Sequence, residues 1–229
     1  MTASTFTSGR SKGRVLPRLR LGAGLVLAVL LLSLGGEVSA RSRVASLPAA
    51  ALPIATAPLD GRGTAKPVAA WSRMCEVSPA ECGVDTAEPA VITLTPALWR
   101  VVARVNRGVN ARIKPRSDQD HWGVVDRWSY PDDGAGDCED YQLLKRRLLA
   151  VQGLPRRAMR MTVVIDERGE GHAVLTLRTD RGDLILDNKT DAILPWQATG
   201  YVFVKRESED GAAWVSLGGV SSPTATANR

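Results

Sequence analysis

The sequence predicts an α+β fold in which N-terminal helices pack on an antiparallel β-sheet. Two observations support this prediction. Apolar residues recur at helical spacing in the first part of the folded region, and short β-rich runs separated by turn residues fill the second part. Helices grouped before strands are typical of the α+β class.

The first predicted helix begins at Thr95-Pro96 and ends before Pro115. Thr95 is a favourable N-cap residue, and proline is favoured at the first helical position. Apolar residues recur along it at steps of three and four: Leu98, Val102, Val105, Val109 and Ile113. A polar segment that contains tryptophan follows at residues 117–136 and is predicted to be a loop.

The second predicted helix begins at Cys138 and ends near Gly153 and Pro155, because both residues terminate helices. Asp137 can cap it, and Asp140 lies three residues further on, as in an acidic variant of the capping box. Its predicted buried stripe consists of Tyr141, Leu144, Leu148 and Val151. Cys138 therefore falls in the first turn.

Five strands are predicted after this helix. They are short runs rich in β-branched and other apolar residues, bounded by turn signals such as Arg168-Gly169 and Arg181-Gly182. Their ranges are 158–165, 172–177, 184–187, 201–205 and 214–217.

Residues 1–40 have the pattern of a cleaved signal peptide. A basic segment precedes the apolar run 21–34, and Val38-Ser39-Ala40 supplies small residues for cleavage. The run is shorter than the roughly 20 residues that span a bilayer. Cleavage and export to the periplasm are therefore expected, with retention as an anchor the alternative. Residues 41–70 are predicted to be a flexible Ala/Pro-rich lead-in, 71–217 the folded domain and 218–229 a loose tail.

The charge of the chain does not favour binding to nucleic acid. The predicted signal peptide carries a net charge of +4 of the chain's +6, which leaves +2 for the remainder. Nucleic-acid binding relies on a concentrated positive surface, so no nucleic-acid partner is expected.

The three cysteines are interpreted in the context of export. Cys75 and Cys82 are predicted to form a local disulfide in an oxidising compartment. The alternatives are two free thiols or half of a metal site, but no other Cys or His cluster could complete a zinc site. This pairing leaves Cys138 outside the disulfide, which calls for a separate explanation.

Cys138 has the position of a catalytic nucleophile. The positive end of a helix dipole favours the thiolate form, and N–H groups in the first turn can face a developing oxyanion. The alternative is a small buried residue. The acidic neighbours Asp137, Glu139 and Asp140 predict that this segment is not buried.

His172 and Asp187 are the predicted base and its orienting group. A turn centred on Asp180-Arg181 places His172 one diagonal step from Asp187 on neighbouring strands, within reach of a hydrogen bond. A bulge at Gly182 would break this register, and the alternative is a strand-end histidine without contact to Asp187. The other histidine, His121, has no obvious fixed partner.

Six sequence blocks within residues 71–203 resemble the bacterial transglutaminase-like cysteine proteinases. Gly136-Asp137-Cys138-Glu139-Asp140-Tyr141 is similar to the core motif of that family. The segments around His172-Ala173 and Leu186-Asp187 resemble its other two motifs. The resemblance implies a papain/transglutaminase-like fold and peptide-bond hydrolysis by the triad Cys138, His172 and Asp187.

The resemblance also implies a cofactor and partners. The best-known members are LapG-type periplasmic proteases, which cleave large surface adhesins and release cells from biofilms. In them calcium binds through acidic residues that correspond to Asp137 and Glu139, and Asp140 adds a third carboxylate here. The resemblance also implies an inner-membrane regulatory protein as a further partner. The alternative for these acids is helix capping.

Two other functions are compatible with the same residues. A transglutaminase-type enzyme would transfer the acyl group to an amine instead of water. An inactive periplasmic binding module is the third possibility, which the intact set of Cys138, His172 and Asp187 disfavours.

Overall fold

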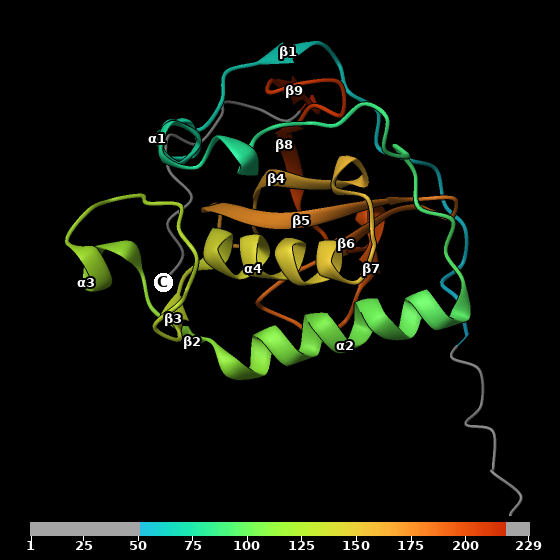
Figure 1. Cartoon of the computed structure of the whole chain (residues 1–229), viewed down its shortest axis with the longest axis horizontal. Coiled ribbons are helices and arrows are strands. Elements are labelled where there is room, and N and C mark those ends of the chain that lie inside the picture. Colours follow the sequence, from blue (N-terminus) through green and yellow to red (C-terminus); the bar gives the residue numbers. More distant parts are fainter. Residues whose placement is uncertain (1–50, 219–229) are drawn as a thin grey trace, which may run out of the picture. The chain divides into compact units, whose positions relative to one another are not determined.

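A seven-stranded antiparallel sheet forms the centre of the structure (Figure 1). The computed structural model describes residues 51–218. The strand order is β1-β9-β8-β4-β5-β6-β7. The bounds are Thr64–Ala65 (β1), Met159–Ile165 (β4), Gly171–Thr179 (β5), Gly182–Leu186 (β6), Leu194–Pro195 (β7), Val202–Glu207 (β8) and Trp214–Ser216 (β9). The α+β class and the antiparallel sheet predicted from the sequence are confirmed.

Helices α2 (Pro96–Arg112) and α4 (Cys138–Val151) pack side by side, and α4 packs along β5 (Figure 1). The Thr95 side chain accepts a hydrogen bond from the N–H of Leu98, and Pro96 occupies the first turn. Both capping signals at the start of α2 therefore act as expected. The predicted cap of α4 was wrong, because the Asp137 side chain makes no capping hydrogen bond to that helix and accepts the N–H of Asp118 instead.

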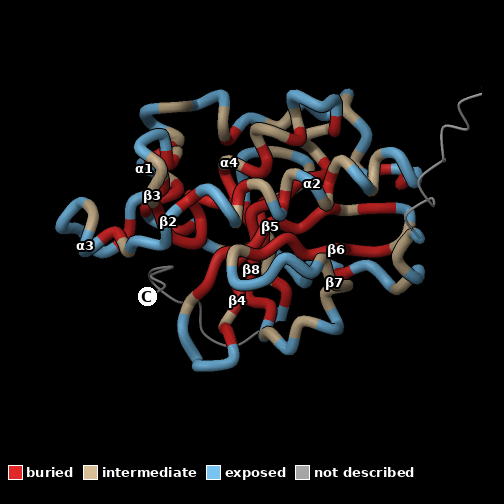
Figure 2. The backbone as a smooth tube through the Cα atoms, turned by 90° about the horizontal axis from the view of Figure 1, so that it is seen from below, coloured by how far each residue is buried: buried red, intermediate tan, exposed pale blue. Residues whose placement is uncertain are grey.

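Helix α4 is buried on two sides, whereas the sequence predicted one buried stripe. Tyr141 and the half-buried Leu144 and Leu148 pack in one cluster with residues of α2. Leu143 and Leu149 instead enter the main core with the sheet. Val151, the last residue of the predicted stripe, is 75% exposed. Figure 2 shows the resulting buried layer of helix and strands in red.

Side chains alternate between the two faces of the sheet, as the period of a strand requires. Leu175 and Leu177 of β5 enter the main core on the α4 side. Val174, which has the opposite parity, belongs to a smaller cluster on the other face with Ile185 and Phe203. His172 has the same parity as Val174, and Asp187 the same parity as Ile185. Both side chains therefore leave the backbone on the face of the smaller cluster.

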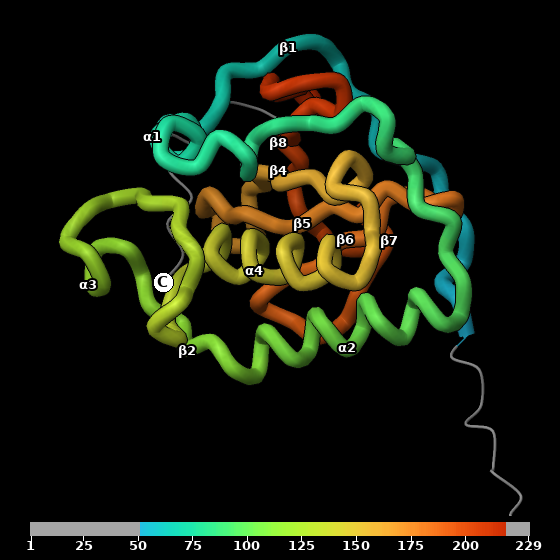
Figure 3. Tube along the Cα trace, in the orientation of Figure 1, coloured from blue at the N-terminus to red at the C-terminus, as the bar shows by residue number. Residues whose placement is uncertain are grey.

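The sequence placed the start of the folded domain at Trp71, but the folded part begins earlier in the chain. Leu59 is buried, and its N–H donates to Asp183. Strand β1 then pairs with β9, and helix α1 (Ala69–Val77) follows. Figure 3 shows this first described segment, in blue, running beside β6 and β7 before it reaches β1. Ala/Pro-rich composition therefore concealed a segment that the sheet holds by backbone hydrogen bonds.

Short elements complete the fold. A 3-10 turn, η1 (Pro79–Glu81), follows α1, and the expected disulfide joins Cys75 to Cys82 across it, with Cα atoms 5.7 Å apart. The segment predicted as a loop contains helix α3 (Asp118–Trp122). A parallel two-residue ladder pairs β2 (Lys114–Pro115) with β3 (Ala135–Gly136). The remaining 3-10 turns are η2 (Arg156–Ala158) and η3 (Trp196–Ala198).

The predicted signal peptide, the start of the predicted lead-in and nearly all of the predicted tail lie outside the described residues. Within residues 51–218, no helix is long and apolar enough to cross a membrane.

Candidate active site

Cys138 occupies the first turn of α4, as predicted, but it is fully buried. Its sulfur accepts a hydrogen bond from the N–H of Ala173 at 3.3 Å and donates one to Oε2 of Glu139 at 3.1 Å. The pairing of β5 with β6 ends at Leu175–Leu186, so the Ala173 N–H lies beyond that ladder and donates to the sulfur. The first turn of α4 thus lies beside the start of β5.

The acidic residues around Cys138 did not keep the segment exposed. Asp137, Glu139 and Asp140 are 4%, 0% and 1% exposed, respectively. The segment that precedes α4 donates backbone N–H groups to two of them, from Asp118 to Asp137 and from Ser129 to Asp140. The expectation of an exposed acidic segment was therefore wrong.

His172 and Asp187 form a buried pair. His172 Nε2 lies 2.9 Å from Asp187 Oδ1, and their side chains are 0% and 3% exposed. The β5–β6 ladder has the register expected for a turn centred on Asp180-Arg181, with Leu177 opposite Leu184. Gly182 has φ +89° and does not shift the register.

Asp187 is held by several groups besides His172. Its Oδ1 also accepts the N–H of Lys189 at 3.1 Å, and its Oδ2 accepts the Tyr201 hydroxyl at 2.7 Å. Burial alone would raise the pKa of Asp187, but the hydrogen bond and charge of His172, with the bond from Tyr201, lower it to about 2. Asp187 is therefore a carboxylate across the neutral range.

The main chain at Asp187 is anchored to both helices. Its carbonyl oxygen accepts hydrogen bonds from Lys145 Nζ of α4 at 2.8 Å and from Asn110 Nδ2 of α2 at 3.0 Å. Lys145 is fully buried, and burial lowers its pKa to about 7. These bonds hold Asp187 at a defined position relative to the helix that carries Cys138.

Asp118, Asp137 and Glu139 form a buried group of carboxylates whose ligand atoms lie within 4.8 Å of one another. The N–H of Asp118 donates to Asp137 Oδ2 at 3.1 Å, and the N–H of Arg127 donates to Asp118 Oδ2. Two of the predicted metal ligands, Asp137 and Glu139, are thus brought together with a residue that the sequence did not indicate.

Asp140, the third predicted ligand, lies outside this group. Its Oδ1 accepts the N–H of Ser129 at 2.9 Å. Its side chain also fills the space beside Gly136, where a Cβ atom would lie 2.6 Å from Asp140 Oδ2. Asp140 therefore fastens the loop at residue 129 to α4, and glycine is required at position 136.

Burial raises the pKa of these acids. It raises that of Asp137 to about 7 and that of Asp140 to about 8, and the pKa of Glu139 lies well above its usual range through burial and the charge of Asp137. Asp137 and Glu139 are also hydrogen-bonded to each other. Two carboxyl groups can share such a bond only when one of them carries a proton.

The same surroundings raise the pKa of the Cys138 thiol, through burial and then through Glu139 and Asp137. The helix terminus and His172 were expected to favour thiolate. In this arrangement the neighbouring carboxylates and the lack of solvent outweigh the helix dipole. The described residues alone therefore hold Cys138 as a neutral thiol.

Asp118 reaches this group through the β2–β3 ladder. Lys114 N–H donates to Gly134 O, and Arg116 N–H donates to Gly136 O. These bonds place the segment just before α3 beside the residues just before α4. A two-residue pairing has no sequence period, so this proximity left no signal in the sequence.

Comparison with protein families identifies the chain. The model of the bacterial transglutaminase-like cysteine proteinase family, BTLCP, matches residues 60–222. The chain belongs to this family. It is a cysteine peptidase, and its substrates are proteins.

Solved structures of LapG from Legionella pneumophila are similar to this BTLCP chain. The calcium-bound form is 25% identical, covers 56% of this chain and 74% of its own, and has a TM-score of 0.47. A second LapG structure is 26% identical over 54% and 71% of the two chains, with a TM-score of 0.45. None of the curated proteins compared with the chain gave a match.

His121 of this BTLCP peptidase has a fixed partner after all. Its Nε2 lies 2.7 Å from Asp133 Oδ2, and its ring stacks on Trp122 with the centroids 3.9 Å apart. The pair joins α3 to the turn before β3. His172, the residue before Ala173, is the histidine that lies beside the Cys138 segment.

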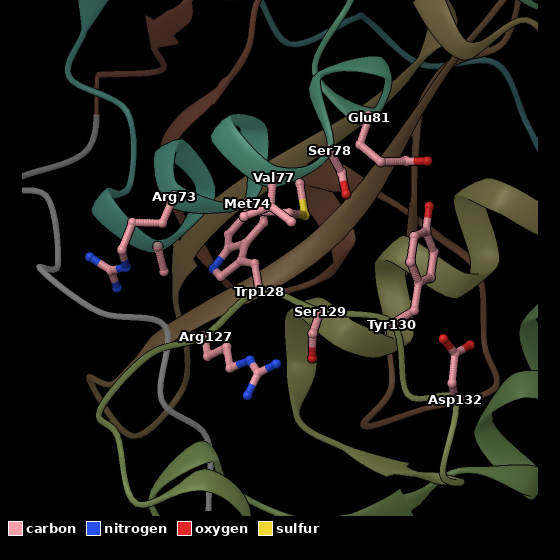
Figure 4. Close-up of a pocket in the computed structure, with 11 residues that line it drawn as sticks. Arg73, Met74, Val77, Ser78, Glu81, Arg127, Trp128, Ser129, Tyr130 and Asp132 are labelled. Carbon is pink, nitrogen blue, oxygen red and sulfur yellow. The ribbon is translucent and has the colours of Figure 1, made fainter.

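A cavity of about 500 Å³ lies between α1 and residues 127–132 of the peptidase. Figure 4 shows Met74 of α1 next to Trp128 at one end and Glu81 near Tyr130 at the other. Cys138, His172 and Asp187 do not line it. Ser129, on its wall, is the residue whose N–H donates to Asp140.

Proposed function

We propose that the chain hydrolyses peptide bonds with Cys138 as nucleophile, His172 as base and Asp187 as the group that orients the base. The observation that carries this proposal is the buried pair of His172 and Asp187, whose side chains lie 2.9 Å apart. The residue after His172 is Ala173, and its N–H donates to the Cys138 sulfur. A nucleophile, a base and an orienting acid in such proximity are the parts required for acyl transfer.

The hydrogen bonds already present in the site determine which atom takes part in each step of the reaction. Nε2 of His172 is bonded to Asp187, so Nδ1 is the nitrogen that takes the proton from Cys138 Sγ. The sulfur attacks the carbonyl carbon, and N–H groups at the start of α4 face the oxyanion. The imidazolium then gives its proton to the leaving amine. The same nitrogen then deprotonates a water molecule, which attacks the acyl-enzyme. This attack releases the product carboxylic acid and regenerates the thiol.

We also propose that Asp118, Asp137 and Glu139 hold a calcium ion. The donor set fits this ion: calcium prefers carboxylate oxygens at about 2.3–2.6 Å, which separates opposite ligands by roughly 5 Å. The three ligand atoms lie within 4.8 Å of one another. A bound calcium ion would supply positive charge beside the thiol. With both acids engaged as ligands, Asp137 and Glu139 would no longer oppose ionisation of Cys138.

The substrate and compartment are further parts of the proposal. The basic and apolar pattern of residues 1–40 supports export to the periplasm with cleavage near Arg41. The resemblance to LapG-type proteases supports a large surface adhesin as substrate and an inner-membrane protein as regulator. Intact-mass analysis of periplasmic protein tests the cleavage, and a retained leader would indicate an anchored enzyme.

A comparison of two protein preparations tests the proposed function. Cells that lack the gene are treated with purified wild-type protein or with Cys138→Ala, and the released surface proteins are identified by mass spectrometry. We expect a fragment with one defined new terminus from the wild type alone. Equal release by Cys138→Ala would contradict the role of the cysteine. A fragment conjugated to an added amine would favour acyl transfer.

A further inference from the structure

Tyr201 touches both members of the His172–Asp187 pair. Its hydroxyl donates to Asp187 Oδ2 at 2.7 Å. Its ring packs edge-on against the His172 imidazole, with the centroids 5.6 Å apart and the planes at 78°. The other carboxylate oxygen, Oδ1, takes both His172 and the N–H of Lys189.

The fold delivers Tyr201 from a distant part of the sheet. It lies immediately before β8, and β4 and β5 separate β8 from β6, the strand that precedes Asp187. The turn at Gly200 has φ +75°, and the N–H of Tyr201 donates to Thr199 Oγ1 at 3.2 Å. The backbone that carries Tyr201 is thus fixed independently of Asp187.

We propose that Tyr201 is a positioning residue for catalysis, which fixes the carboxylate plane of Asp187 and, by edge contact, the imidazole of His172. This inference rests on the proposed function of the Cys138 site. A carboxylate bonded through one oxygen alone can rotate about its Cβ–Cγ bond, and the imidazole would follow it. With Tyr201 on Oδ2, both oxygens are bonded and the imidazole keeps one orientation toward the thiol.

The hydroxyl of Tyr201 is suited to this role as a permanent donor. Burial and the hydrogen bond to Asp187 raise its pKa far above the ordinary value, so it keeps its proton across the neutral range. Tyr201→Phe removes this donor and keeps the ring against His172. The substitution therefore tests the hydrogen bond alone.

Tyr141→Phe is the matched control. The Tyr141 hydroxyl also donates a short buried hydrogen bond, to Ile113 O at 2.6 Å, but it joins α4 to the end of α2. The readout is the second-order rate of alkylation of Cys138 by iodoacetamide, followed by mass spectrometry. Wild type is measured in calcium and in EGTA, and the variants are compared under the faster condition.

We expect Tyr201→Phe to slow alkylation about tenfold, with a melting temperature no lower than that of Tyr141→Phe, whose rate stays within twofold of wild type. Asp187→Asn should be slower still, and adding Tyr201→Phe to it should change the rate by less than twofold, because Tyr201 acts through Asp187. If the two substitutions together multiplied their separate losses of alkylation rate, or if Tyr201→Phe reacted at the wild-type rate, the role of Tyr201 would be overturned and the proposed function would stand. A wild-type protein that reacts no faster than glutathione in both conditions would overturn the proposed function as well.

Discussion

The thiol of Cys138 donates a hydrogen bond to Glu139 Oε2 over 3.1 Å. The nucleophile is therefore bonded to one of the three carboxylates that form the candidate calcium site. Burial, Glu139 and Asp137 all raise the pKa of the thiol. The charge state of this carboxylate group thus decides whether the nucleophile can ionise.

Calcium should control the reactivity of Cys138. In EGTA we expect slow alkylation by iodoacetamide, because the thiol is buried and its pKa is raised. Calcium should accelerate alkylation at least about tenfold, and magnesium should not, since its smaller octahedral shell fits three protein carboxylates poorly. Calorimetry measures the binding directly. No calcium binding and an EGTA-insensitive rate would contradict the proposed calcium site.

Asp118 should be needed for the calcium response, and Asp140 should not. Asp118→Asn removes one charge from the group of three, so calcium affinity should fall about 10- to 100-fold. Asp140→Asn is the matched control, because Asp140 lies outside the group and an amide oxygen can still accept the Ser129 N–H. The reverse order of affinities would support the ligand set inferred from the sequence, Asp137, Glu139 and Asp140.

The calcium-free protein should lose stability as pH rises from about 5 to 7. The pKa of Asp137 is raised from 3.8 to about 7, so between these values the folded state binds more protons than the unfolded state. Stability then falls with rising pH. Below pH 7 Lys145, whose pKa is lowered to about 7, contributes little to this slope. Melting temperatures in EGTA should fall across this window, and calcium should flatten the slope.

Asp187→Asn should keep the fold and lose at least about 100-fold in the rate of Cys138 alkylation. The amide of asparagine lacks the full negative charge of the carboxylate that accepts from His172 Nε2. The imidazole is therefore neither held in place nor stabilised as a cation. Circular dichroism checks the fold. Near wild-type reactivity would show that His172 acts without an orienting acid.

Removal of the Cys75–Cys82 disulfide should affect stability and spare the chemistry. The bridge closes a short loop, with a sequence separation of 7, so its loss should cost about 2–3 kcal/mol of unfolding free energy. The double serine variant is compared with wild type by denaturant unfolding and by alkylation of Cys138. A large fall in alkylation rate at a temperature where the variant is folded would assign the bridge a role in the site.

The parts of the fold that follow local rules could be predicted from the sequence. Thr95-Pro96 located the start of α2, and the turn at Asp180-Arg181 set the register that brings His172 to Asp187. Both features depend on neighbouring residues along the chain. The five longer runs of the sheet were located for the same reason.

What the sequence did not reveal depends on contacts between distant segments. Helix α4 buries polar side chains, among them Lys145 and Arg146, which are satisfied by Asp187 O and by Glu207 of β8. An apolar stripe cannot identify such faces. Asp118 and Tyr201 were missed because a two-residue ladder and the start of a distant strand place them.

The β2–β3 ladder has a consequence for how the enzyme can change. It clamps both ends of the segment 116–134, so the distance between Asp118 and Asp137 does not depend on the length of the chain between them. Closing a longer loop costs only about 0.6 kcal/mol for each doubling of its length. Insertions at the exposed tip, Val124-Val125, should therefore be tolerated. That tip is a place where relatives can diverge, or an engineer can graft a new recognition element, while the carboxylates stay in place.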